Sequence, residues 1–181
     1  WTGKPVSFSG RFYRLEEAQM HPTPLRPEGV PLVIGGGGEK RLLRIVAEHA
    51  SDWNAVSLHP DGYAAKVAAL ERHCAAIGRD PAQISRSWMV GHLIGRDERE
   101  LRERAQRLQR ILVSLQGLSP DEVIARLRER GWLVGTPVEV IEQVRARAAL
   151  GASRLMLQTF DLDDLEVLGL IATQIMPAFA D

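Results

Sequence analysis

Hydrophobic residues follow one another along this chain at two spacings, one typical of helices and one typical of strands. The clearest helical stripe repeats at intervals of four and three residues and consists of Tyr63, Val67, Leu70, Cys74 and Ile77. Short apolar runs without that period predict strands at Leu32 to Ile34, Ser51 to Leu58, Ile84 to Ile94 and Arg154 to Phe160. We expect the first of these strands to be buried. The chain therefore alternates between strands and helices.

Start and stop signals place the other helices. One helix is predicted to begin at Glu39, and Pro60-Asp61-Gly62 breaks the chain before the helix of the stripe begins. Three further helices begin at capping signals, which are Asp97 with Glu100, Ser119 with Pro120 and Glu122, and Thr136 with Pro137 and Glu139. A last apolar stripe predicts a helix that ends at Pro177. The predicted order from residue 31 onward is β-α-β-α-β-α-α-α-β-α.

This order predicts an α/β fold with a parallel sheet and helical crossovers. Four strand-helix units are half of a (β/α)8 TIM barrel, whose full length is typically about 250 residues. We therefore expect a half-barrel of four C-terminal units over residues 31–181, and an open doubly wound sheet is the alternative. Residues 1–30 are predicted to form a hairpin with its turn at Ser9-Gly10 and then a proline-rich lead, all within a single domain 1–181.

Composition narrows the functional classes. The chain has 181 residues, 45% of them hydrophobic, which is enough for one sizeable core. Its 23 basic and 23 acidic residues balance, so neither nucleic acid nor an anionic membrane is indicated as a partner. The single Cys74 and the absence of a long apolar run indicate a cytoplasmic protein. The chain starts at Trp1 rather than Met, which we interpret as a sign of a longer protein.

Four consecutive glycines, Gly35 to Gly38, connect the first predicted strand to its helix. Glycine allows positive φ and close approach of a ligand, and the first N–H groups of a helix attract anions, so this segment is a candidate phosphate site. A purely structural turn explains the glycines equally well, and the dinucleotide fingerprint G-x-G-x-x-G is not matched. Lys40 and Arg41 could contact an anion, although a solvated basic face is the more common role.

Other candidate residues carry less information. His92 lies near the C-terminal end of a predicted strand, where ligands bind in parallel α/β folds, but a hydrogen-bonded structural histidine is the more common case. Cys74 belongs to a helical stripe and is interpreted as a packing residue. We name no catalytic residue and no metal site. Residues considered for substrate contact are Asn54, His59, His92 and Gln158, and Trp53 could line the site or belong to the core.

Several segments in register resemble the luciferase-like monooxygenase superfamily, especially its branch dependent on the deazaflavin coenzyme F-420. They are FSGRFYRL, IGGGGEKRLLRIVAEHASDWN, HCAAIGRDPAQI, VGTPVEVIEQV and the terminal MPAF. The resemblance implies a TIM barrel, hydride transfer or oxygen activation on a small organic substrate, and a cofactor that is F-420 or alternatively FMN. It also implies that Gly35, Gly36, Gly37, Gly38 and the backbone of Glu39 contact the cofactor's phosphate.

The resemblance covers the segments that follow the fourth barrel strand. It implies that the first four strands, with the family's proton-donating histidine, are missing from this chain, so no residue is given that role. Two hypotheses result: the chain is the cofactor-phosphate half of an oxidoreductase, or it is a truncated non-catalytic half-barrel that self-associates. Exposed strand edges predict a homodimer under either hypothesis.

Overall fold

The computed structural model describes residues 1–27 and 29–180, which form two compact units, Trp1–Leu32 and Val33–Asp181. In the first unit, β1 (Val6–Ser9) pairs antiparallel with β2 (Arg14–Ala18). A hydrogen bond of 2.9 Å from Gly10 N to Tyr13 O closes the turn. The predicted hairpin is therefore confirmed, but its turn runs from Gly10 to Tyr13 rather than lying at Ser9-Gly10, because Ser9 is still paired with Arg14 as the last residue of β1. The described residues of the proline-rich lead contain no helix, as expected.

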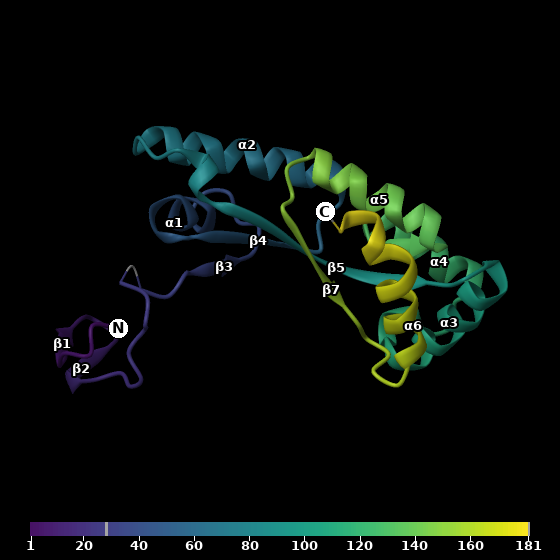
Figure 1. The fold of residues 1–181 in the computed structure, drawn as a ribbon, viewed down its shortest axis with the longest axis horizontal. Coiled ribbons are helices and arrows are strands. Elements are labelled where there is room, and N and C mark those ends of the chain that lie inside the picture. The colour runs from purple at the N-terminus through teal and green to yellow at the C-terminus, as the bar shows by residue number, and fades with distance from the viewer. Residues whose placement is uncertain (28, 181) are drawn as a thin grey trace. The chain divides into compact units, whose positions relative to one another are not determined.

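The second unit alternates strands and helices (Figure 1). The strands are β3 (Val33–Gly35), β4 (Asp52–Val56), β5 (Ser85–Ile94), β6 (Leu133–Gly135) and β7 (Arg154–Gln158). The helices are α1 (Leu42–His49), α2 (Pro60–Ala76), α3 (Glu98–Ile111), α4 (Pro120–Glu129), α5 (Pro137–Ala149) and α6 (Leu165–Leu170). After α6 the chain continues through a π-helical turn, Ile171–Ile175, and a 3-10 turn, Met176–Phe179.

All paired strands of this unit are parallel, which confirms the predicted sheet type. The order β3-β4-β5-β7 follows the chain, and one row of the sheet joins Gly35, Asn54, Ser87 and Arg154. β6 pairs only with the end of β5, at His92 to Ile94. This strand is missing from the predicted order, so the sheet has five strands rather than four. Three residues directly before a capping box are too few to show a strand period.

The core lies on one face of the sheet. Trp53, Ala55, Trp88 and Val90 alternate along β4 and β5 and pack against apolar side chains of α1, α2, α5 and α6. Figure 1 shows α1, α2 and α5 along the same side of the strands. Tyr63 of α2 stacks between Trp53 and Trp88, with ring centroids 5.4 and 4.1 Å apart. A second cluster holds α3 and α4 beyond the end of β5.

Several predicted boundaries are wrong. Leu32 and Val33 are 40% and 52% exposed, because β3 pairs with β4 alone and forms an edge of the sheet. The first helix begins at Leu42 rather than Glu39, since residues 39–41 form a turn. Pro60 to Gly62 do not separate elements but form the first turn of α2, where proline fits at N1. Pro177 lies inside the terminal 3-10 turn.

Two capping boxes and the packing role of Cys74 agree with the structure. Ser119 and Thr136 each form a capping box, with Glu122 and Glu139 as the third helical residues. Cys74 is buried, and burial raises the pKa of its thiol, which suits a packing role. Within residues 1–27 and 29–180, no helix is long and apolar enough to cross a membrane. The same residues contain no group of three His, Cys, Asp or Glu side chains placed to hold a metal ion.

Candidate functional site

The glycine segment leaves the sheet at the C-terminal end of β3. Gly36 has φ of 125°, a conformation that favours glycine, and a Cβ added there would lie 3.0 Å from Leu42 Cδ1. Two bonds from β4 hold this residue: Gly36 N donates to Asn54 O at 3.0 Å, and Trp53 Nε1 donates to Gly36 O at 2.7 Å. The start of the loop is therefore fixed to the neighbouring strand.

The backbone N–H groups from Gly37 to Leu42 have no acceptor among the described residues. The first bond after them runs from Leu43 N to Gly38 O, at 3.0 Å, and leads into α1. Such a run of free donors at the start of a helix, reinforced by the positive end of the helix dipole, suits an anion. This run overlaps the predicted segment Gly35 to Glu39 only from Gly37 to Glu39, and it continues to Leu42.

Two side chains of helix α2 hold Glu39, which is the last residue of the predicted site. Lys66 Nζ is 2.7 Å from Glu39 Oε1, and His73 Nε2 is 2.7 Å from Glu39 O. The hydrogen bond from Lys66 and the charge of its ammonium lower the pKa of Glu39. Neither Lys66 nor His73 is identified by sequence reasoning, because nothing in the α2 stripe shows which polar residues face the loop.

The two basic residues that were considered as anion ligands are placed differently from Lys66. Lys40 and Arg41 are exposed, and neither pairs with an acidic side chain within the described part of the chain. They therefore belong to a solvated basic face, which was named above as the more common role of such residues.

The sheet face opposite the core carries polar side chains. Asn54 Nδ2 is 3.0 Å from Ser87 Oγ and 3.3 Å from Met156 Sδ. Ser87 Oγ donates to Asp52 Oδ1 at 2.8 Å, and Arg154 Nη1 lies 3.4 Å from Asp52 Oδ2. Alternate residues of a strand point to the same face of the sheet, and Gly35 is paired with Asn54. The network therefore lies on the same face as Gly35. It forms a mostly buried polar network beside the glycine loop.

Two of the predicted substrate-contact residues lie on this face. Asn54 is buried in its middle, and Gln158 is exposed at the end of β7, level with Gly91 of β5. An aromatic pair not found from the sequence lies beside the paired residues Gly91 and Gln158: Trp132 covers Gly91, where a Cβ would be 2.4 Å from the indole, and stacks on Phe160 at 5.1 Å. Polar and aromatic groups thus meet at the C-terminal ends of β5 and β7.

The other candidate residues lie elsewhere. His92 faces Asp164 and Val167 of the α6 region, with Nε2 3.0 Å from Thr159 Oγ1, and burial lowers its pKa to about 4. It is a buried, hydrogen-bonded histidine. His59 is the exposed N-cap of α2, 3.3 Å from Asp61. Trp53 belongs to the core.

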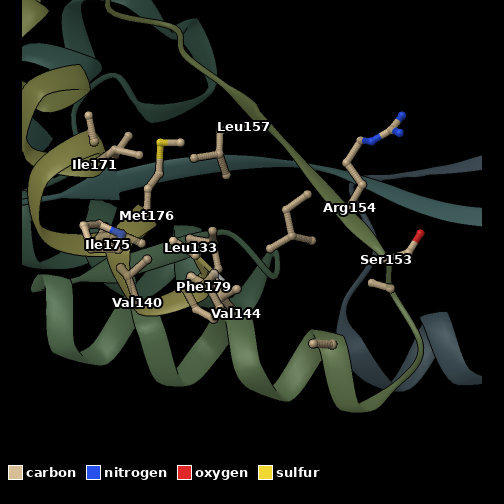
Figure 2. A pocket seen from close by; sticks show the side chains of 16 residues that line it. Leu133, Val140, Val144, Ser153, Arg154, Leu157, Ile171, Ile175, Met176 and Phe179 are labelled. Carbon is tan, nitrogen blue, oxygen red and sulfur yellow. The ribbon is translucent and has the colours of Figure 1, made fainter.

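A large apolar cavity lies away from the glycine loop. It is an apolar groove of about 660 Å³ between α5, β7 and the C-terminal turns. Figure 2 shows Ile171, Ile175 and Met176 from the C-terminal turns at one end of it, and Val140 and Val144 along α5. Arg154 and Ser153 lie at its edge. Apart from these two residues, the side chains that line the groove are apolar.

Comparison with known proteins identifies a family from the sequence and a set of neighbours from the fold. The sequence profile described as luciferase-like monooxygenase matches residues 1–154. An F-420-dependent secondary alcohol dehydrogenase, solved with an F-420–acetone adduct, superposes with a TM-score of 0.74 at 19% identity, over 98% of this chain and 57% of its own. The F-420-dependent tetrahydromethanopterin reductase of Methanopyrus kandleri gives a TM-score of 0.74 at 16% identity, over 99% of this chain and 59% of its own.

A third structure contains a flavin. The oxygenating constituent of 3,6-diketocamphane monooxygenase from Pseudomonas putida, in complex with FMN, gives a TM-score of 0.63 at 14% identity, over 98% and 59% of the two chains. At these identities the likeness establishes the mixed α/β fold with a parallel sheet. The chain spans somewhat more than half the length of these structures, and no curated protein matches its sequence.

Proposed function

Because the chain belongs to the luciferase-like monooxygenase family, we propose that it binds a flavin-type cofactor and serves an oxidoreductase or monooxygenase acting on a small organic substrate. The proposed phosphate site is Gly35, Gly36, Gly37, Gly38 and the backbone of Glu39. The observation that carries the proposal is the run of N–H groups from Gly37 to Leu42 without an acceptor among the described residues.

The residues present offer polar groups that suit such a cofactor. The glycine loop offers donors for a phosphate, and the polar face with Asn54 and Gln158 adjoins it, where a ring system and a substrate could lie. When bound, the cofactor supplies hydride transfer or oxygen activation, while the protein supplies position and electrostatics. We propose F-420 as the cofactor and FMN as the alternative, because both present a phosphate and neighbours in fold are described with each.

Calorimetric titration of the purified chain with F-420, FMN and riboflavin tests the proposal. We expect F-420 or FMN to bind and riboflavin, which lacks the phosphate, to bind more weakly. The ligand with the lower Kd decides between the two cofactors. Absence of binding by both phosphorylated ligands would refute the assignment for this chain.

A charge introduced into the loop tests where the phosphate sits. Gly38 does not have the positive φ of Gly36, so Gly38→Asp adds a carboxylate with little backbone strain. We expect this variant to weaken FMN binding by about tenfold or more, as repulsion in a partly buried site costs over 1 kcal/mol, and to leave riboflavin binding unchanged. Gly169→Asp, at an exposed position of α6 with open space around it, is the matched control.

A second candidate is a non-catalytic module that self-associates. Two observations favour it: β3 and β7 each pair with a single strand, and the apolar groove of about 660 Å³ lies beside β7. Free strand edges and apolar grooves are surfaces on which a second copy can pack. This candidate would be favoured if the chain binds a cofactor without turnover and light scattering shows that it is a dimer.

A further inference from the structure

We propose that Lys66 is the cation that binds the cofactor's phosphate, and that Glu39 occupies this lysine while no cofactor is bound. The inference rests on the proposed function and adds a residue outside the predicted segment. In this arrangement the Glu39 carboxylate stands in for the phosphate. Binding of the cofactor then exchanges one anion for another at the same ammonium group.

Lys66 is placed for this role by two contacts. Its Nζ reaches Glu39 Oε1 at 2.7 Å, and its Cε lies 3.7 Å from the position that a Cβ on Gly37 would take. The side chain is only 22% exposed, so it is confined beside the loop rather than extended into solvent. An ammonium group fixed next to free backbone donors completes an anion site in a way that the donors alone do not.

The other basic residues near the loop are less suited. Lys40 and Arg41 are exposed and carry no contact that fixes their side chains within the described part of the chain. Ordering a free lysine or arginine side chain on binding costs rotamer entropy, whereas Lys66 is already held. Of these three side chains, Lys66 alone is therefore preorganised.

A phosphate can pair with Lys66 only if the carboxylate of Glu39 gives up its contact with this lysine. This carboxylate is 48% exposed and belongs to the run of residues whose N–H groups are free, so an unpaired charge there would repel a phosphate. His73 holds the backbone O of Glu39 at 2.7 Å, which leaves the side chain able to turn to solvent while the loop stays in place. The phosphate monoester of FMN carries about 1.5 to 2 negative charges at neutral pH, so it attracts the ammonium more strongly than the carboxylate does.

A purely structural ion pair is the competing explanation. In that case Lys66 and Glu39 only fasten α2 to the loop, and removing either residue would weaken the binding of phosphorylated and unphosphorylated ligands equally. The exchange predicts opposite effects of the two substitutions. This difference in sign separates the explanations.

The test is calorimetric binding of FMN and riboflavin to the wild-type chain and to three variants. Lys66→Gln is expected to weaken FMN binding by about tenfold or more, the usual range for a charged hydrogen bond, with riboflavin unaffected. Glu39→Gln is expected to strengthen FMN binding severalfold, since it removes the competing charge. Lys40→Gln, the matched control for net charge, is expected to change FMN binding less than threefold.

The outcomes distinguish the two proposals. If FMN binds better than riboflavin but Lys66→Gln behaves like Lys40→Gln, the role of Lys66 is refuted and the proposed function stands. Weaker FMN binding by Glu39→Gln would also refute the exchange. A chain that binds neither ligand refutes both proposals. As a measurement free of substitutions, NMR titration of the Glu39 carboxyl should show its pKa rising when FMN binds, and an unchanged pKa would contradict the exchange.

Discussion

At the scale of single residues, Gly36 is the most constrained position of the candidate site. Its φ of 125° and the 3.0 Å approach of Leu42 to an added Cβ leave no relaxed place for a side chain. We expect Gly36→Ala to lower the free energy of unfolding by about 1–3 kcal/mol, the usual cost of such a conformation. Urea unfolding measures this. Gly38→Ala, without the positive φ, should cost nothing, and an equal loss in both variants would contradict the argument.

His92 gives a pH dependence whose sign follows from its burial. Burial lowers its pKa from 6.5 to about 4 in the folded chain, so between these values the unfolded chain binds more protons. This contribution to stability is complete above pH 6.5 and is lost as the pH falls toward 4, by roughly 3 kcal/mol in total. Urea unfolding at pH 7.5, 5.5 and 4.5 checks it. His92→Gln should flatten the slope, while His49→Gln, at an exposed histidine, should not.

Sequence reasoning at this scale finds residues whose role follows from local chemistry. Gly35 to Gly38 stand out because glycine is informative wherever it occurs in a run. Lys66 could not be found, since its partner Glu39 is 27 residues away and only the packing of α2 brings them together. Trp132 was missed for the same reason: it covers Gly91 across the sheet. The assignment of the glycines to a phosphate stays a prediction.

At the scale of elements, periodicity and caps predict most of the fold. The stripe of α2 and the capping boxes at Ser119 and Thr136 are found where they were expected, because these signals act within a few residues. The exposed edge position of β3 could not be predicted, because which strands lack a second neighbour depends on the whole sheet. β6 was missed because its three residues, Leu133–Gly135, lie directly before the capping box at Thr136 and are too few to show a strand period.

A buried ion pair connects two of these elements. Arg104 of α3 donates to Asp164, the N-cap of α6, at 2.7 Å, and both side chains are at most 7% exposed. We expect Asp164→Ala to lower the free energy of unfolding by about 3–5 kcal/mol, because it leaves a buried guanidinium without this partner. Urea unfolding of Arg99→Gln provides the control. Its pair with Glu103 is exposed, so a loss below about 1 kcal/mol is expected there.

At the scale of the whole molecule, the edges of the sheet determine how copies of the chain would meet. Val33 on β3 and Leu157 on β7 are 52% and 36% exposed on strands with one neighbour each. If copies associate through these edges, Val33→Lys and Leu157→Lys should lower the apparent mass in size-exclusion light scattering. Val138→Lys, on the exposed surface of α5, is the control and should have no effect. A monomeric wild-type chain at high concentration would contradict the self-association proposal.

The bond from the Trp53 indole to Gly36 O has a consequence for spectroscopy. The indole is the only side chain of the Trp53, Tyr63 and Trp88 stack that also holds the glycine loop, at 2.7 Å. Any rearrangement of the loop therefore changes the hydrogen bond of a fluorophore. A shift in the emission maximum on adding inorganic phosphate, abolished in Trp53→Phe but kept in Trp1→Phe, would report on the loop without a coloured ligand.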